Sequence, residues 1–498
     1  MSYSNRSRTY DYFDSLHPEE AATAAVRVIN ILKENPTPRG TELLRNFLRD
    51  GHKHLNEEST STSEEKQLRI GKILVFLSKE IGKDNDGTVM YEGYYEDRQV
   101  AVKRLLQSHH TVVDREIKHL IKSDQYHNIV RYHGMESDRD FHYLAMEHCD
   151  CNLVDLIQIY SAGSYELVNN DPHCSMGPVT VHEDDRLGDV KLWEENKNRP
   201  SPLLLKLMRD VVSGLVALHA LNIIHRDLKP KSILIIKEIS TLCAKLSDMG
   251  FCRSWEDTGW KAPEQHLCGQ QTRAMDMFSL GCILFFCITQ GKHPFGEPDE
   301  RDRNIKSNNK KNLLLIQDFP EAFHLISRLL EADDLERPKI AEVLQHPMFW
   351  GAKERLDFLH DTSDFLHDTS DEANNNDEFW NKIKNTRKNV FRGKWNSKVD
   401  IDIIKHGRQF IKRDFNFLNV PDLLRLIRNM FNHRGHLPSN IQTLVGVQYE
   451  KFDDYFTSRF PNLLIEVYKV VCQGYKEKVC GNFVCRYAAA ALSCCPIV

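Results

Sequence analysis

The chain has 498 residues, of which 41% are hydrophobic and 28% are charged, with a formal net charge of −5. This length accommodates two or three domains, and the composition is ordinary for globular proteins that bury hydrophobic cores. The small negative charge excludes a basic field over the whole molecule. Any contact with nucleic acid must therefore come from a local basic patch.

The amino-terminal segment comes first in chain order. Its opening residues, MSYSNRSRTYDYFDS, contain no apolar run of a secretory signal, and no part of the chain approaches the ~20 uncharged apolar residues needed to span a bilayer. We therefore expect a cytoplasmic chain without a membrane span. Residues 1–68 are predicted to be an extension with one amphipathic helix, PEEAATAAVRVINILKE, followed by a polar linker, and they indicate no function.

Changes in residue pattern predict the domain boundaries. Residues 70–350 pass from strand-like alternation to long helices, as in one domain, with a polar insertion at 161–202 that we expect to be a mobile surface loop. Residues 351–377 are predicted to be a linker in which the segment DFLHDTS occurs twice, as a short duplication in a linker or helix cap. Residues 378–487 have helical periodicity, and 488–498 are predicted to be a loose tail.

The 13 cysteines are mostly single residues in apolar segments, such as Cys243 and Cys282. This pattern is typical of reduced core thiols and favours a reducing compartment. No His or Cys pair has the spacing of a structural zinc site, so none is expected. Cys494 and Cys495 could carry lipid, but CPIV is a poor prenylation signal, and we favour an unmodified tail.

The first segment that suggests chemistry is IGKDNDGTVMYEG followed by RQVAVKRLL. It predicts a strand, a tight turn and a second strand whose Lys103 projects from an apolar run. A buried lysine requires an anion, which phosphate groups and the carboxylate of Glu116 in a following helix would supply. A glycine turn and one lysine alone are weak evidence for a nucleotide site.

Further signatures follow in order, namely IIHRDLKPKSILI, KLSDMGF, GWKAPEQ, the apolar helix MDMFSLGCILFF and LERPKIAEVLQHPMF. Together they make residues 70–350 resemble a protein kinase, which implies a two-lobed fold that binds ATP and Mg²⁺. The resemblance implies that Asp227 orients the acceptor hydroxyl, Lys229 balances the transferring phosphoryl group and Asp248 holds Mg²⁺.

The same resemblance implies roles for other residues. Asp276 would orient the catalytic loop, and Arg337 would pair with Glu264. Met146 would be the gatekeeper before a hinge that meets adenine through backbone groups. The residues expected to bind ATP are Gly82, Gly87, Val89, Lys103, Glu116, Glu147 and Cys149.

Three departures from the kinase pattern predict impaired activity. Asp84 replaces the second glycine of the phosphate loop and brings a carboxylate toward the triphosphate, which should weaken ATP binding. Ser232 stands where an asparagine would bind the second Mg²⁺, and its shorter side chain is a poorer ligand. The segment FCRSWEDTGWK is short and offers Ser254 and Thr258 for loop phosphorylation.

A dense motif, VPDLLRLIRNMFNHRGHLP, lies beyond the kinase-like region. Its apolar residues repeat at helical spacing, which places Arg428 and Asn429 on a polar face, with His433 four residues after the asparagine. A guanidinium, an amide and an imidazole at a helix end could cleave RNA, because the cation stabilises phosphate charge and the imidazole can donate a proton. On spacing alone, a solvated helix face with a surface histidine is the preferred interpretation.

With DYFTSRFPNLLIEVY, this motif resembles the kinase-extension nuclease (KEN) domain of the inositol-requiring kinase/endoribonuclease family of the unfolded protein response, in a plant-like form. The resemblance implies that Arg428, Asn429 and His433 are catalytic and act without metal. A tyrosine expected thirteen residues before the arginine is Phe415, which lacks the hydroxyl that would assist proton transfer unless His406 or water replaces it. A basic patch that could hold RNA, or simply face solvent, comprises Lys405, Arg408, Lys412 and Arg413.

The predicted fold class is therefore α+β, a two-lobed protein-kinase fold followed by an all-α KEN domain. The family normally adds a lumenal sensor and a membrane span, which are expected to be missing. The first functional hypothesis is a weakened serine/threonine kinase and endoribonuclease that autophosphorylates and cleaves stem-loop mRNA, as in mRNA splicing during endoplasmic reticulum (ER) stress. The second is an inactive pseudoenzyme that binds nucleotide or family members. Expected partners are RNA, not DNA, and a second family member in a homodimer or heterodimer, which could recruit the chain to the ER membrane.

Overall fold

The computed structural model describes residues 66–83, 88–107, 110–161, 190–194, 199–239, 241–247, 259–267, 271–368, 378–411 and 413–476. The described residues from Gln67 onward belong to one compact unit. The predicted extension before residue 66, most of the insertion at 161–202 and the tail with Cys494 and Cys495 lie outside the described residues.

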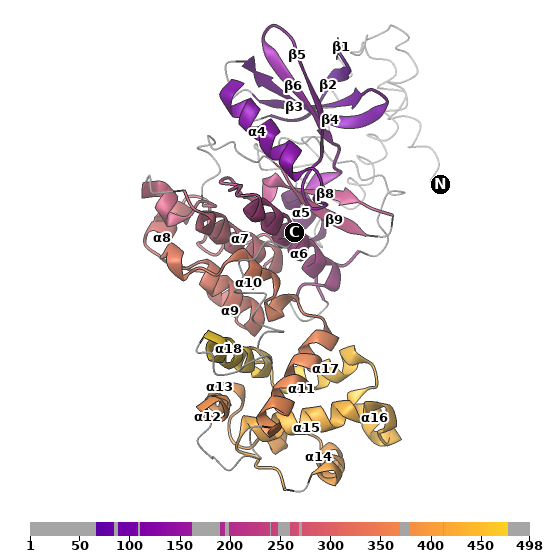
Figure 1. Ribbon diagram of the computed structural model, residues 1–498, viewed down its shortest axis with the longest axis vertical. Coiled ribbons are helices and arrows are strands. Elements are labelled where there is room, and N and C mark those ends of the chain that lie inside the picture. The colour runs from indigo at the N-terminus through magenta and orange to yellow at the C-terminus, as the bar shows by residue number, and fades with distance from the viewer. Residues whose placement is uncertain are drawn as a thin grey trace, which may run out of the picture. The chain divides into compact units, whose positions relative to one another are not determined.

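An antiparallel sheet of six strands begins the described chain, with the order β1-β2-β3-β4-β6-β5 (Figure 1). Alternate side chains of these strands, such as Ile73 and Val75 on β2 and Val100 and Val102 on β4, form a core on one face of the sheet. Helix α4 lies beside this sheet. The elements are β1 (Gln67–Ile70), β2 (Ile73–Lys83), β3 (Val89–Tyr95), β4 (Arg98–Leu106), α4 (His110–Ser123), β5 (Tyr132–Ser137) and β6 (Phe141–Glu147).

A mainly helical region with a three-stranded sheet, β7-β8-β9, follows. Helix α7 is buried from Met275 to Ile288 because its apolar residues leave no polar face. The elements are β7 (Cys151–Asn152), α5 (Leu153–Ser161), α6 (Pro202–Ala220), η3 (Pro230–Ser232), β8 (Ile233–Lys237), β9 (Leu242–Leu246), η4 (Pro263–Leu267), α7 (Arg273–Ile288), α8 (Arg301–Lys306), η5 (Leu313–Ile316), α9 (Pro320–Leu329), η6 (Asp334–Glu336), α10 (Ile340–Leu344) and η7 (Pro347–Phe349).

The described remainder of the chain is helical and has its own hydrophobic core around Trp395 and Phe452. The elements are α11 (Ala352–Asp368), α12 (Glu378–Asn385), α13 (Arg387–Val390), η8 (Trp395–Lys398), α14 (Ile401–Gly407), η9 (Arg408–Phe410), α15 (Val420–Asn432), η10 (Arg434–His436), α16 (Ser439–Val445), α17 (Tyr449–Arg459) and α18 (Leu463–Lys476). The order of sheet, helical region and second helical domain is the predicted α+β arrangement.

The predicted linker at 351–377 is wrong in its described part, because residues 352–368 form helix α11. The duplicated DFLHDTS has a period of seven residues, which is close to two helical turns, so both copies present the same face. Leu359 and Leu366 are consequently both buried, and Phe358 and Phe365 pack into the same core. A duplication that resembles a polar linker in the sequence therefore builds a core helix.

Specific contacts join this helical domain to the end of the kinase-like region. Arg355 on α11 lies 3.3 Å from Glu321 on α9 and 2.9 Å from Asp453 on α17, and all three side chains are largely buried. Near η7, the ring of Tyr468 on α18 packs edge-on against His346, with 5.3 Å between ring centres. Buried charged and aromatic contacts of this kind fix the two regions against each other.

No helix in the described parts of the chain is both long and apolar enough to cross a membrane.

Candidate active sites

The loop that carries the first candidate site is held by a buried carboxylate. Asp276 at the start of α7 accepts hydrogen bonds of 2.9 Å from the backbone N–H groups of His225 and Arg226, and its Oδ2 lies 2.8 Å from Nε2 of His219. These bonds hold Arg226 in the left-handed region, with φ at 71°. The structure confirms the predicted role of Asp276 in orienting this loop.

Asp227 and Lys229 lie together at the end of this loop. Nζ of Lys229 is 2.9 Å from Oδ2 of Asp227, and both side chains are mostly buried. The hydroxyl of Ser232 is fully buried, and its hydrogen bonds among the described residues are to backbone groups, since it accepts from Lys229 N–H at 3.0 Å and lies near the carbonyls of Asp227 and Lys229. The Ser232 side chain therefore stabilises the conformation of the loop between Asp227 and Ser232.

A second structural prediction concerns Arg337. Its guanidinium makes a two-pronged pair with Glu264, with distances of 2.6 and 2.9 Å, and it also donates to the carbonyl of Ala274. This arrangement confirms the predicted pairing and anchors the segment after the catalytic loop to helix α7.

Lys103 lies at the centre of the six-stranded sheet and is 3% exposed. Its neighbours across the sheet are Met90 on β3 and Leu144 on β6, so it projects from an apolar part of the strand, as the sequence predicts. Gly82 near the end of β2 has open space where a side chain would be, and Val89 at the start of β3 is buried. The remaining predicted residues around this site, Asp84, Gly87 and Asp248, lie outside the described residues, as does the side chain of Glu116.

The predicted hinge connects β6 to β7. Met146 is buried, and Glu147 extends its carboxylate to Lys245 on β9, 3.0 Å away, rather than leaving it unpaired. Burial raises the pKa of the Cys149 thiol to about 12, so this side chain stays protonated and uncharged at neutral pH. The side chains of Met146 and Glu147 therefore contact other parts of the protein, and a ligand at the hinge would meet backbone groups.

The second candidate site is at the carboxyl end of α15. The helix begins with a cap in which the Asn419 side chain accepts from Asp422 N–H at 2.9 Å, and its apolar face, including Leu423 and Ile427, is buried as predicted. His433 follows the last helical residue, and its N–H still bonds to the carbonyl of Asn429 at 3.3 Å. Asn429 and His433 therefore remain one helical turn apart.

Arg428 is 13% exposed and forms an ion pair with Asp364, with 2.9 Å between Nη1 and Oδ1. Asp364 is half exposed and belongs to the second copy of DFLHDTS. The carboxamide oxygen of Asn429 lies 3.5 Å from two nitrogens of Arg428, and its amide nitrogen is buried with no hydrogen-bond partner among the described residues. An unpartnered amide donor beside a guanidinium suits a phosphate oxygen.

The imidazole of His433 is exposed on one side and stacks on Phe410 on the other, with 4.0 Å between ring centres and an angle of 12°. Phe410 also meets the edge of His406 at 5.2 Å. Burial, followed by the nearby His433, lowers the pKa of His406, which keeps this imidazole neutral and able to accept a proton. Nε2 of His406 is buried and has no hydrogen-bond partner among the described residues.

Phe415 is 5% exposed and packs inside the core of the helical domain. Its ring meets Trp395 edge-on, the guanidinium of Arg425 lies 5.0 Å from its centre, and its Cζ edge faces Gly407 at the end of α14. A hydroxyl added at Cζ would therefore point toward the α14–η9 segment, which also carries the His406 and Phe410 rings.

The predicted basic patch is largely paired within the protein. Arg408 forms two bonds to Asp414, of 2.9 and 3.1 Å, and Arg413 lies 3.2 Å from Asp422. Lys405 is 3.8 Å from Asp402, and Lys412 lies outside the described residues. These carboxylates reduce the positive field that the sequence suggests.

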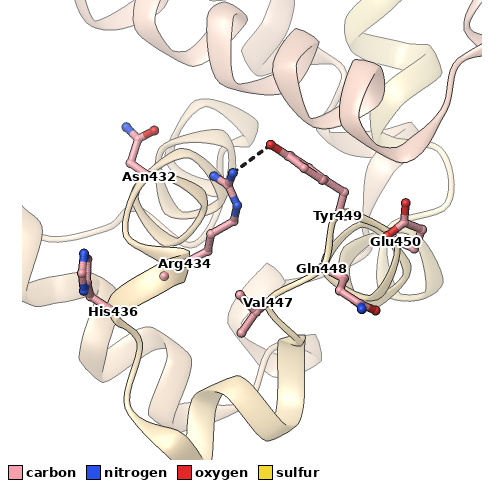
Figure 2. A pocket seen from close by; sticks show the side chains of 8 residues that line it. Asn432, Arg434, His436, Val447, Gln448, Tyr449 and Glu450 are labelled. Atoms are coloured by element: carbon pink, nitrogen blue, oxygen red, sulfur yellow. Dashed lines mark hydrogen bonds between the residues drawn. The ribbon is translucent and has the colours of Figure 1, made fainter.

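An open depression of about 700 Å³ lies beside the end of α15 (Figure 2). Within it, Arg434 donates to the hydroxyl of Tyr449 at 2.9 Å and covers the rings of Phe431 and Tyr449. Its lining residues are Asn432, Arg434, Gly435, His436, Val447, Gln448, Tyr449 and Glu450. Sequence reasoning missed this depression, since Tyr449 carries no local motif, and it missed Asp364 and Phe410 for the same reason.

Comparison with known proteins defines the class. Residues 76–349 match the protein kinase domain, and residues 355–483 match ribonuclease 2-5A. The fold and the two sites thus belong to a protein kinase that continues directly into a ribonuclease domain.

Individual relatives define the family. The chain is 47% identical over 430 residues to the serine/threonine-protein kinase/endoribonuclease IRE1a of Arabidopsis thaliana, covering 82% of this chain and 50% of that protein. It is 43% identical over 424 residues to IRE1 of Oryza sativa subsp. japonica, covering 82% and 44%. It is 35% identical over 447 residues to an Arabidopsis protein named inactive serine/threonine-protein kinase/endoribonuclease IRE1-like, covering 81% and 78%.

The chain belongs to the IRE1 family of serine/threonine-protein kinase/endoribonucleases. This confirms the resemblance inferred from the kinase signatures and the nuclease motif. The chain spans about half the length of the IRE1a and rice IRE1 relatives.

Proposed function

We propose that this protein cleaves RNA slowly at the end of α15 and binds Mg²⁺·ATP at the kinase-like site, as an impaired kinase/endoribonuclease of the unfolded protein response. The observation that carries the proposal is the cluster at the end of α15. Arg428, the unpartnered amide of Asn429 and the exposed His433 lie within one helical turn of each other. These residue types in this arrangement suit a phosphodiester that breaks at its 5′-oxygen.

The proposed reaction uses the ribose 2′-hydroxyl as the nucleophile, so the enzyme supplies no attacking water. Arg428 and the Asn429 amide would hold the phosphate oxygens as charge develops on them, and His433 would donate a proton to the leaving 5′-oxygen. Phe415 cannot take the proton from the 2′-hydroxyl. The neighbouring imidazole of His406, whose pKa is lowered, or water would have to accept it, and because Nε2 of His406 is buried, this ring would act through Nδ1.

The depression next to α15 is proposed to receive the RNA strand. Arg434 and Tyr449 would offer it a cation and a ring, which suit phosphate contact and base stacking respectively. The proposed substrate is a stem-loop, because unpaired loop nucleotides can present both their backbone and their bases to such a site.

The kinase-like site fits a nucleotide in its described part. Lys103 would hold phosphate oxygens, and the paired Asp227 and Lys229 would orient an acceptor hydroxyl; Mg²⁺ would neutralise the phosphate charge when bound. Ser232 fits a second Mg²⁺ poorly, because its hydroxyl would have to leave its backbone partners. We therefore propose weak nucleotide binding and slow autophosphorylation, tested by the thermal shift that Mg²⁺·ATP causes in the wild-type protein and in Lys103→Met. Asp84→Gly should enlarge that shift.

We also propose domain limits of 70–350 for the kinase-like domain and 352–487 for the nuclease domain. Helix α11 is assigned to the nuclease domain because its buried side chains share the core of α15 and α17. The contacts of Arg355 with Glu321 and Asp453 support a kinase-like domain that positions the nuclease. A dimer with a second family member, and recruitment to the ER membrane by that partner, are part of the same proposal.

A second candidate function is a pseudoenzyme that binds RNA or family members without cleavage. The specific observation in its favour is that Arg428 is already paired with Asp364, while Phe410 covers one face of His433. The two functions differ in one experiment. Purified protein is incubated with a stem-loop RNA, and cleavage that is lost in His433→Ala supports the enzyme, whereas RNA binding without cleavage supports the pseudoenzyme.

A further inference from the structure

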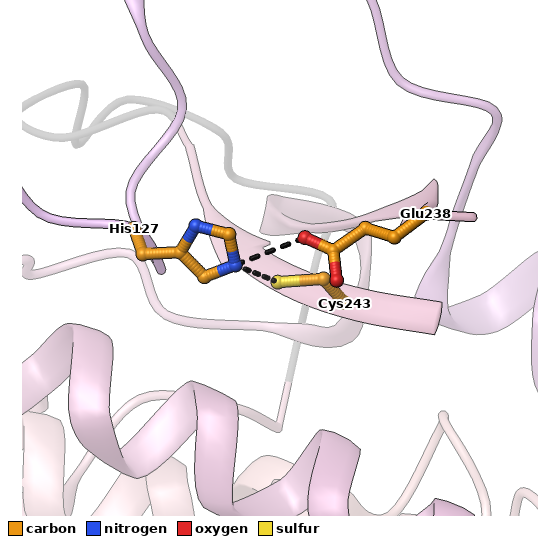
Figure 3. Close-up of side chains that lie close together, drawn as sticks. All are labelled: His127, Glu238 and Cys243. Atoms are coloured by element: carbon orange, nitrogen blue, oxygen red, sulfur yellow. Dashed lines mark hydrogen bonds and ion pairs between the residues drawn. The ribbon is translucent and has the colours of Figure 1, made fainter. Parts of the chain in front are cut away.

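A cluster of three metal-ligating side chains lies in the kinase-like region outside both candidate sites (Figure 3). His127 precedes β5, Glu238 follows β8, and Cys243 is on β9. Nε2 of His127 is 3.0 Å from Oε1 of Glu238 and 3.3 Å from Sγ of Cys243. Their ligand atoms all lie within 4.8 Å of one another.

Backbone hydrogen bonds hold the three residues in place. The segment containing Asn128 runs alongside β9, where Leu246 N–H bonds to the carbonyl of Asn128 and Val130 N–H bonds to the carbonyl of Leu246. The Asn128 amide also bonds to the carbonyl of Ala244 at 3.1 Å, directly after Cys243. The cluster is therefore built on paired backbone.

The turn between β8 and β9 fixes the third residue. Glu238 N–H donates to the carbonyl of Thr241 at 2.9 Å, which closes the hairpin and places the glutamate over the same end of the sheet as Cys243. A ligand set on two paired segments loses little conformational freedom when it binds an ion.

We propose that His127, Glu238 and Cys243 bind a zinc-class divalent cation, with a solvent molecule as the fourth ligand. A thiolate, an imidazole and a carboxylate form a mixed soft and borderline donor set that zinc prefers over magnesium or calcium. Zinc bonds of about 2.0–2.3 Å in tetrahedral geometry separate neighbouring ligand atoms by roughly 3.3–3.6 Å. A nitrogen–sulfur pair lies at the upper end of this range and a nitrogen–oxygen pair at the lower end, so the 3.3 Å between Nε2 and Sγ and the 3.0 Å between histidine and glutamate both have to open by a few tenths of an ångström.

An ion can reach the cluster from solvent. The side chains of His127 and Glu238 are 62% and 36% exposed, whereas Cys243 is buried behind them. The two exposed ligands therefore form the entrance, and the thiol forms the base of the site.

Binding requires the thiol to release its proton. Burial raises the pKa of Cys243 to about 11, and the carboxylate of Asp210 adds to this, while the charges of Lys206 and Lys245 oppose it. The cation has to replace that proton, so the apparent affinity should rise with pH across the neutral range. Lys206 is itself paired with Asp210 at 2.7 Å, which limits its repulsion of the ion.

The proposed ion would join two parts of the kinase-like region. His127 belongs to the segment that leads from α4 into the six-stranded sheet, and Cys243 belongs to the three-stranded sheet. A bound cation would therefore stabilise the junction between the sheets. Sequence spacing could not predict the site, because more than one hundred residues separate His127 from the other two ligands.

The test uses the full-length chain, freed of metal by chelator and titrated with Co²⁺ as a spectroscopic probe of tetrahedral thiolate sites, without nucleotide. We expect one equivalent of Co²⁺ with a thiolate-to-cobalt charge-transfer band, and displacement of the band by Zn²⁺. Cys243→Ser should abolish the band. His127→Gln and Glu238→Gln alter exposed side chains that do not form the core, and each should weaken Co²⁺ binding at least tenfold, with a smaller Zn²⁺-dependent rise in Tm.

The matched control is His133→Gln on β5, a histidine outside the cluster, which should retain the band and the affinity. The proposal is overturned if the wild-type protein shows no charge-transfer band, if the band survives in Cys243→Ser, or if His133→Gln reduces it as much as His127→Gln does. Loss of thermal stability in His127→Gln without any Co²⁺ band in the wild-type protein would identify a simple ion pair and would also overturn it.

Discussion

The pair between Arg428 and Asp364 leads to a prediction about RNA affinity. Because Asp364 lies 2.9 Å from the guanidinium, its carboxylate competes with an RNA phosphate for the same cation. Asp364→Asn removes that negative charge but keeps the size of the side chain. We expect the variant to bind RNA more tightly than the wild-type protein.

The magnitude follows from Coulomb's law. A phosphate on the opposite side of the guanidinium would lie roughly 6–7 Å from the Asp364 carboxylate, and at an effective dielectric constant of about 40 the repulsion is about 1.3 kcal/mol. Asp364 is half exposed, and screening at physiological salt reduces the repulsion to somewhat under 1 kcal/mol. The dissociation constant should therefore fall about three- to fivefold.

Fluorescence anisotropy with a labelled stem-loop RNA measures this change, and it should diminish as salt is raised. Asp357→Asn is the matched control, since Asp357 holds the equivalent position in the first copy of DFLHDTS and pairs with Lys353. In an Arg428→Ala background, the gain from Asp364→Asn should shrink. Equal RNA affinity in the wild-type protein, Asp364→Asn and Arg428→Ala, with all three folded, would show that this pair does not face the RNA.

Three further predictions follow from the geometry. Phe415→Tyr should raise the cleavage rate by up to ~10²–10⁴-fold without changing RNA affinity. A variant that binds RNA but cleaves it no faster than the wild-type protein would favour the pseudoenzyme. Asp276→Asn should lower the free energy of unfolding in urea by about 1.5–3 kcal/mol and weaken Mg²⁺·ATP binding, because one of the three donors that Asp276 accepts from loses its acceptor. An unchanged free energy of unfolding would contradict the role of Asp276 in holding this loop. At the domain junction, burial lowers the pKa of His346 well below its usual value and that of His324 to about 4. The unfolded chain therefore binds these protons at a higher pH than the folded protein does, so the free energy of unfolding is at its full value above about pH 6.5 and falls as the pH decreases toward 4. The expected loss for His324 is about 2–3 kcal/mol. Chemical unfolding between pH 7 and 4.5 measures this loss, and His324→Gln should reduce it.

The acid sensitivity of the junction has a clear structural cause. The backbone N–H of Met348 donates to Nδ1 of His346, so the proton of this ring must be on Nε2, which lies 2.9 Å from Nδ1 of His324. His346 therefore donates to His324, and both rings are neutral. Protonation of His324 would place two donors opposite each other in a largely buried contact.

The sequence predicts much of the fold because its signals are local. The apolar repeat of α15, the uniformly apolar α7 and the strand around Lys103 each lie within one short segment, and their burial follows from their own periodicity. The error at α11 has a local cause too, since its charged residues suggest a linker although its leucines and phenylalanines share one helical face.

The features that the sequence did not predict depend on pairing between distant segments. The ion pair of Arg428 with Asp364 spans 64 residues, and Phe410 approaches His433 from a different element. The His127, Glu238 and Cys243 cluster depends on the pairing of a loop with β9. No residue spacing encodes such contacts, because tertiary packing determines them.

Single-turnover cleavage of a stem-loop RNA by the purified protein tests the central claim most directly, with His433→Ala compared with His133→Ala, a change in a histidine of strand β5 outside both candidate sites. The account predicts slow cleavage with a 2′,3′-cyclic phosphate product, because the 2′-hydroxyl attacks the adjacent phosphate. Cleavage should be lost in His433→Ala, retained in His133→Ala, and absent on RNA with a 2′-deoxy group at the cleaved position. Cleavage that persists in His433→Ala or on the 2′-deoxy substrate would contradict the account.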